Sequence, residues 1–172
     1  MLRSFVILIA AAAPLAAQTQ QSANLNVSNS QALYLSGHNY LVRAAEQMPD
    51  SLYNFKPTAD VRSFGALIGH VAGAERMFCA MATGQQMTAE DNIEKTQTTK
   101  AGLVAALKAS GDYCAKAYAM SDADAAAPLN VFGQAKNKGY ALTMNATHVW
   151  EHYGNVVTYM RLKGQTPPSS QR

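Results

Sequence analysis

Four segments of this chain carry apolar side chains at the three- and four-residue spacing that gives an α-helix one buried face. They cover about residues 31–48, 64–83, 99–120 and 140–163, and strand-like alternation is hard to find between them. Amphipathic helices bury their apolar faces against one another. The sequence therefore predicts an all-α fold, a four-helix bundle with up-down-up-down topology.

The ends of these segments carry residues that start and stop helices. Side-chain oxygens suited to cap the exposed N–H groups of a first turn occur at Ser30, Ser63 and Thr98 or Thr99. Residues that stop a helix follow at Pro49, Gly84 and Gly164. Loops are expected over 49–62, 84–97 and 121–139, the last with room for one short helix.

The first residues indicate a secretory signal rather than part of the fold. Arg3 precedes a short apolar run from Phe5 to Ala13, and small residues follow up to Ala17. Such a run is too short for a membrane helix and is typical of a cleaved signal peptide over residues 1–17. We expect export to the periplasm or the exterior, with a flexible leader over 18–30, one domain over 31–168 and a tail over 169–172.

Charge and hydropathy narrow the choice of partners. The 172 residues include 14 Lys and Arg and 11 Asp and Glu, and without Arg3 the net charge is 13 − 11 = +2. No block of like charges is present, which argues against a nucleic-acid partner. No second apolar run is long enough for a stable membrane anchor. The expected partner is a small-molecule substrate, and a homodimer stays open.

The two cysteines, Cys79 and Cys114, leave two alternatives open. An oxidising compartment after export favours a disulfide between them. In an up-down-up-down bundle, however, each lies near the end of one of two antiparallel helices, so the two residues are far apart. Cα atoms more than about 7 Å apart cannot be bridged. A different course of the 84–97 link would permit the bond, and otherwise the cysteines are two buried thiols.

The histidines carry the strongest functional signal. His148 and His152 are one helical turn apart, so both imidazoles can face one ion. His70 lies roughly 10 Å along the second helix, and the pair lies roughly 12 and 18 Å along the fourth, if these helices run in the same direction. Three neutral imidazoles suit one divalent transition metal, such as zinc, nickel, iron or copper, and leave coordination positions open. The alternative for each ring is an ordinary hydrogen-bonded histidine at the core margin.

Other polar residues lie near the same level of the bundle. Asn145, Asn155 and Tyr159 fall on or beside the helix face of the histidine pair, and are candidates to orient the rings by hydrogen bonds. His38 in the first helix reaches a similar level. It is a candidate ligand or catalytic partner, and otherwise a polar residue at the edge of the core.

Glu151 completes an H-x-x-E-H pattern with the histidine pair, which supplies a general base in inverted zincins. Those peptidases use an acidic third ligand further along the chain, and no Asp or Glu follows Glu151, so this class is disfavoured. Glu151 lies about 60° around the helix from His148. It is a candidate base at the edge of the site, or a solvated residue paired with Arg161 or Lys163.

Two stretches of the chain resemble the DinB-like (DinB/YfiT-type) metalloenzyme superfamily. They are "FKPTADVRSFGALIGHVAGAERMF" (55–78) and "ATHVWEHYGNVVTYMRLKGQTPPSS" (146–170). The resemblance implies a four-helix bundle that binds one divalent metal through His70, His148 and His152. Some members of the superfamily are thiol-dependent S-transferases or isomerases. The signal peptide departs from the cytosolic thiol-using branch, which puts that activity in doubt for this chain.

Two functions follow as hypotheses. The first is an exported metal-dependent hydrolase in which a metal-activated water attacks the substrate, assisted by Glu151 or His38. The second is a non-catalytic metal-binding or stress-related module. A polar pocket that opens onto the metal favours catalysis, whereas a closed ligand shell favours the binding role.

Overall fold

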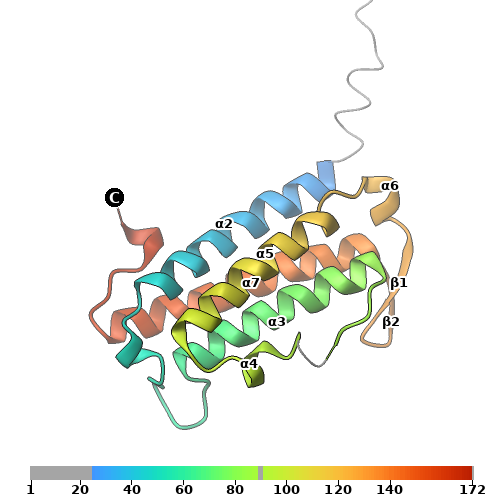
Figure 1. Cartoon of the computed structure of the whole chain (residues 1–172). Coiled ribbons are helices and arrows are strands. Elements are labelled where there is room, and N and C mark those ends of the chain that lie inside the picture. Colours follow the sequence, from blue (N-terminus) through green and yellow to red (C-terminus); the bar gives the residue numbers. More distant parts are fainter. Residues whose placement is uncertain (1–24, 89–90, 172) are drawn as a thin grey trace, which may run out of the picture.

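The computed structural model describes residues 25–88 and 91–171 as a bundle of four long helices (Figure 1). These are α2 (Leu25–Gln47), α3 (Phe64–Thr83), α5 (Lys100–Ala117) and α7 (Lys138–Leu162). The shorter elements are η1 (Asp50–Leu52), α4 (Ile93–Thr96), α6 (Asp122–Ala125), β1 (Pro128–Val131), β2 (Gln134–Asn137) and η3 (Pro168–Ser170). The predicted all-α four-helix bundle is confirmed. The antiparallel β1–β2 hairpin was not predicted, because its four-residue strands are too short to show an alternating pattern.

The direction of the helices differs from the expected up-down-up-down order. In Figure 1, α2 and α7 run one way, and α3 and α5 run the other way. A disulfide between Cys79 and Cys114, with Cα atoms 5.3 Å apart, joins the last part of α3 to the last part of α5. These two helices are therefore parallel neighbours, and the topology is corrected to up-down-down-up. The same correction removes the geometric objection to the disulfide.

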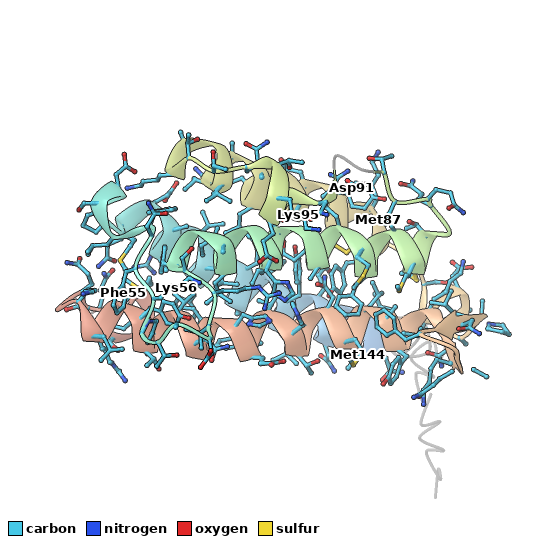
Figure 2. The ribbon with its side chains drawn as sticks, turned by 90° about the horizontal axis from the view of Figure 1, so that it is seen from below. Phe55, Lys56, Met87, Asp91, Lys95 and Met144 are labelled. Carbon is cyan, nitrogen blue, oxygen red and sulfur yellow. A yellow bond between two sulfur atoms is a disulfide. The ribbon has the colours of Figure 1, made fainter. Side chains whose placement is uncertain are left out.

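The link from α3 to α5 makes this topology possible, because it returns along the whole length of α3. A Cβ atom at Gly69 would lie 2.9 Å from the Cα of Glu94, and one at Gly73 would lie 3.2 Å from the carbonyl oxygen of Asp91. The two glycines, one turn apart on α3, therefore let the backbone of the link lie directly on the helix. Arg76 and Asp91 form an ion pair that holds it there. Figure 2 shows Lys95, Asp91 and Met87 in a row along α3.

The first helix begins at Leu25, five residues before the expected cap at Ser30. The carboxylate of Asp122 in α6 accepts hydrogen bonds from the backbone N–H of Asn26 (3.0 Å) and Val27 (2.9 Å). A carboxylate at this end satisfies free N–H groups and complements the helix dipole. Ser30 instead contacts Thr143 through their hydroxyl oxygens. Residues 25–30, expected in the flexible leader, are therefore helical.

Local capping residues set most of the other helix ends as predicted. Ser63 accepts a hydrogen bond from the N–H of Ala66, and Thr99 accepts one from Gly102. Gly84 ends α3 with a φ of 72°, in the left-handed region. The last helix starts two residues earlier than expected, because Asn137 is its cap.

The bundle core is mostly apolar and encloses one fully buried carboxylate. Its largest fully buried apolar side chains include Phe64, Leu41, Met48, Ile68, Leu107, Leu142 and Met160. Among them lies Glu75, which is 0% exposed. Its carboxylate accepts hydrogen bonds from Tyr34 (3.1 Å) and Ser110, and it contacts Nδ1 of His38 at 2.9 Å. These partners replace the water that a buried carboxylate loses.

No helix in the described part of the chain is long and apolar enough to cross a membrane. The predicted signal peptide and the first part of the leader lie outside the described residues.

The disulfide is expected to contribute strongly to stability. It closes a loop with a sequence separation of 35 residues, and closing such a loop in the unfolded chain is worth about 3–4 kcal/mol. We predict that the Cys79→Ala/Cys114→Ala double variant loses about this much free energy of unfolding in urea titrations. Addition of dithiothreitol should destabilise the wild type and leave the double variant unchanged. A loss below about 1 kcal/mol would contradict the prediction.

The Asp122 contact with α2 is expected to be worth about 1 kcal/mol, the usual contribution of a helix cap. We predict that Asp122→Ala lowers the free energy of unfolding by this amount, because the N–H groups of Asn26 and Val27 lose their acceptor. Asp112→Ala, at an exposed position of α5, is the control for loss of one charge. Equal stability of the two variants would show that the contact does not hold α2.

Candidate metal centre

Three histidine rings meet between α3 and α7. Nε2 of His148 lies 3.2 Å from Nε2 of His70 and 3.0 Å from Nε2 of His152. One ligand atom from each of the three residues lies within 4.8 Å of the others. Nitrogen ligands about 2.0–2.1 Å from a tetrahedral metal are about 3.3 Å from one another. The spacing of the rings therefore fits a single transition-metal ion.

The rings converge although α3 and α7 are antiparallel rather than parallel as expected. His148 and His152 are the eleventh and fifteenth of the 25 residues of α7, so they lie symmetrically about its middle. If such a helix is reversed, His148 and His152 exchange positions along the bundle axis. The middle of the pair stays at the same position along that axis. The pattern therefore predicted that these three rings converge, but through an incorrect assumption about helix direction.

The electrostatics of the three rings favour the neutral form. Burial lowers the pKa of His148 to about 4, and the neighbouring rings of His152 and His70 add to this effect. Burial also lowers the pKa of His70 and of His152. Three neutral imidazoles with Nε2 atoms at one point form the donor set that divalent zinc, nickel or iron prefers. The residues present thus fit the expected metal.

Two residues contact the outer nitrogens of these rings. The side-chain amide of Asn155 lies 3.2 Å from Nδ1 of His152. The amide atom that faces the ring is the nitrogen Nδ2, and this contact holds the orientation of the imidazole. An amide turned by 180° would present its oxygen instead, accept a hydrogen bond from Nδ1–H and leave the Nε2 lone pair free for a metal. Glu94, in α4, places Oε2 3.6 Å from Nδ1 of His70. Nδ1 of His148 is buried and has no hydrogen-bond partner among the described residues.

Sequence reasoning missed Glu94, because it lies in a link that was expected to be a loop. The signal that could have found it is Gly69, the residue before His70. This glycine leaves room for the backbone of Glu94. A glycine next to a ligand candidate can mark a close approach of another segment of chain.

Two of the three residues expected to orient the rings make their hydrogen bonds to other groups. The amide nitrogen of Asn145 is 3.4 Å from Sγ of Cys79 and 3.4 Å from the hydroxyl of Tyr118. The hydroxyl of Tyr159 donates to the carbonyl oxygen of Arg62 (2.8 Å). Asn145 therefore contacts the disulfide, and Tyr159 holds the loop that precedes α3.

His38 is not in the metal centre, which corrects its expected role as a ligand or catalytic partner. Its ring contacts the buried carboxylate of Glu75 and packs on Gly111, where a Cβ atom would lie 2.6 Å from Nε2. Glu75 is five residues after His70, so it points to a different side of α3. His38 belongs to that side and faces the core between α2 and α5.

Glu151 is exposed on α7 near the rings. Its negative charge partly opposes the effect of burial on the pKa of His70 and of His152. Among the described residues it makes no ion pair with Arg161 or Lys163, the partners that a solvated glutamate was expected to find.

A cavity of about 840 Å³ lies beside His152. Its polar lining comprises Lys56, Asp60, Arg62, Ser63, Glu94, His152, Asn155 and Tyr159. Figure 2 shows Phe55 and Lys56 on the loop that forms part of this lining. The histidine cluster is therefore open, at His152, to a cavity with a mixed polar and apolar lining.

Comparisons with known proteins agree with this architecture. The family model of the DinB superfamily matches residues 34–156. A DinB-like protein from Bacillus cereus ATCC 10987 is 16% identical, with a TM-score of 0.67 over 78% of this chain and 93% of that one. A DinB-like protein from Bacillus subtilis is 22% identical, with a TM-score of 0.65 over 87% of this chain and 99% of that one.

A mycothiol-dependent maleylpyruvate isomerase is 15% identical, with a TM-score of 0.62 over 78% of this chain and 65% of that one. No curated protein matches the sequence of this chain. The structural likenesses show a shared fold, and the family match covers most of the bundle together with all three clustered histidines. The chain belongs to the DinB superfamily.

Proposed function

We propose that this protein is an exported metal-dependent hydrolase that acts on a small molecule. His70, His148 and His152 would hold one divalent ion of zinc, nickel or iron. The observation that carries the proposal is the convergence of three neutral Nε2 atoms beside an open polar cavity. When bound to such ligands, a metal of this kind polarises a substrate carbonyl and lowers the pKa of water.

The surrounding residues have separate tasks in this proposal. Asn155 fixes the orientation of His152, and Glu94 faces the outer nitrogen of His70, so both rings keep their Nε2 atoms toward the centre. The buried ring of Phe78 packs edge-on against His148, with ring centroids 5.7 Å apart, and covers one side of that imidazole. Substrate enters from the side of His152, where the cavity lies.

Two carboxylates near the rings are candidates to accept a proton. Glu94 is engaged by Arg62, whose Nε lies 3.0 Å from Oε1. Glu151 makes no ion pair within the described residues, and its charge reaches His70 and His152. We therefore assign the role of proton acceptor to Glu151.

The alternative, a non-catalytic metal-binding or stress-related module, has less support. A site that only holds an ion is expected to close its shell with protein ligands. Three histidines and a neighbouring cavity of about 840 Å³ instead favour access for a substrate.

Export is proposed on two grounds. The first residues have the pattern of a signal peptide, and the Cys79–Cys114 disulfide suits an oxidising compartment. Reduced low-molecular-weight thiols are cytosolic reagents, so these features also argue against a thiol cosubstrate. The hydrolase proposal needs no such cosubstrate.

Metal content tests the ligand set directly. We predict about one zinc or nickel ion per wild-type chain after gel filtration, measured by elemental mass spectrometry, and less than about a tenth of this in His148→Ala, which keeps only two ligands. His38→Ala removes the histidine outside the centre and should bind metal as the wild type does, provided that circular dichroism shows it folded. Equal metal content in wild type and His148→Ala would contradict the site.

Glu151→Gln tests catalysis separately from metal binding. We expect the variant to keep its metal and to hydrolyse 4-nitrophenyl acetate about 10²–10⁴-fold more slowly, which is the usual effect of removing a general base. Glu46→Gln, an exposed glutamate on α2, is the control. Unchanged hydrolysis in Glu151→Gln would remove Glu151 from the mechanism, and no metal-dependent hydrolysis in the wild type would favour the non-catalytic alternative.

A further inference from the structure

The cavity beside His152 contains a cation with free hydrogen-bond donors. Arg62 uses its Nε for the ion pair with Glu94. Within the described residues no acceptor contacts its two terminal amino groups, and its side chain is 43% exposed. An arginine offers five N–H donors in a planar fork that matches a carboxylate. Most of that fork is therefore free to bind a ligand in the cavity.

Arg62 is held at a fixed position relative to the metal centre. The hydroxyl of Tyr159 donates to its carbonyl oxygen at 2.8 Å. The carboxylate of Glu94 contacts Arg62 with Oε1 and lies 3.6 Å from Nδ1 of His70 with Oε2. Arg62 and His152 line the same cavity, and Glu94 connects Arg62 to His70.

The charges of the cavity lining indicate which anion it suits. Two cations, Lys56 and Arg62, and two anions, Asp60 and Glu94, line the space, so their sum is zero. A ligand with one negative charge can pair with Arg62 without strong repulsion from the two acids. A doubly charged phosphate would be repelled more strongly by Asp60 and Glu94, so its net binding energy would be smaller.

The backbone at the start of α3 also argues against phosphate. Phosphate sites at helix N-termini use free N–H groups. Here the N–H of Phe64 donates to Phe55, that of Gly65 donates to Tyr53, and that of Ala66 donates to the hydroxyl of Ser63. These three donors are engaged, which leaves the side chain of Arg62 as the main anion-binding group of the cavity.

We infer that the substrate is a small organic acid derivative whose carboxylate is bound by Arg62 while its hydrolysable end faces the three histidines. This inference rests on the proposed hydrolase function and adds the class of substrate. Arg62 acts in it as a specificity-determining residue that selects ligands with one negative charge.

The test compares two esters that differ in one charge, monomethyl succinate and dimethyl succinate. Binding to the cobalt(II)-loaded protein is followed by calorimetry and by the visible absorption of the metal. We expect the wild type to bind the monoanion at least about tenfold more tightly than the neutral diester. In Arg62→Gln the ratio of the two affinities should fall by about 10- to 100-fold, the range for a charge-assisted pair. Arg62→Lys should keep only part of it, and Lys95→Gln, on α4 outside the cavity lining, should keep all of it.

Metal content is measured on the same samples, so that the two proposals can fail separately. Equal binding of both esters to the metal-loaded wild type, or an unchanged preference in Arg62→Gln, would overturn the role of Arg62 and leave the metal site standing. Tighter binding of inorganic phosphate than of monomethyl succinate, lost in Arg62→Gln, would overturn the carboxylate assignment. A wild type that binds no cobalt would overturn the proposed function, and the same ester titration on the metal-free protein would then decide the role of Arg62.

Discussion

The close contact between the returning link and α3 determines how the other parts of this bundle are placed. Gly69 and Gly73 leave no side chain between the helix and the link, so the backbone of residues 91–94 lies against α3. The link can then cover the full length of the bundle before α5 begins, which makes α3 and α5 parallel. The disulfide and the position of Glu94 beside His70 both depend on this course of the chain.

The bundle separates two groups of polar residues on different sides of α3. Toward α7, three imidazoles, His152 buried and His70 and His148 partly buried, bring one nitrogen each to a common point, an arrangement that a cation would stabilise. Toward α2 and α5, the fully buried carboxylate of Glu75 takes hydrogen bonds from two hydroxyl groups and contacts His38. The carboxylate of the second group has its hydrogen-bond partners within the protein. The first group is open to a cavity at His152, whereas His38 and Glu75 of the second group are buried in the core.

Local chemistry explains which parts of the fold were predictable from the sequence. The ends of α3 and the start of α5 follow from Ser63, Gly84 and Thr99, which act within one turn of their own positions. The start of α2 does not, because its acceptor, Asp122, is separated from it by more than ninety positions. Helix direction was equally inaccessible, since it depends on how a polar link packs rather than on the pattern of the helices it joins. The convergence of the three histidines was predictable because the spacing of His148 and His152 is local on α7. The pair also lies at the middle of that helix, so its height in the bundle beside His70 is the same for either helix direction.

The central position of the histidine pair in α7 has a consequence for how firmly a bound ion is retained. Ten residues of the helix precede His148 and ten follow His152. Helices lose structure first at their ends, and opening of the middle approaches the cost of global unfolding. Fraying at either end of α7 would therefore have to travel nearly three turns before it loosened a ligand. Exchange of the ion with the surroundings is then expected to proceed sideways past Asn155 and Arg62, at a rate set by the mobility of those side chains rather than by partial melting of the bundle.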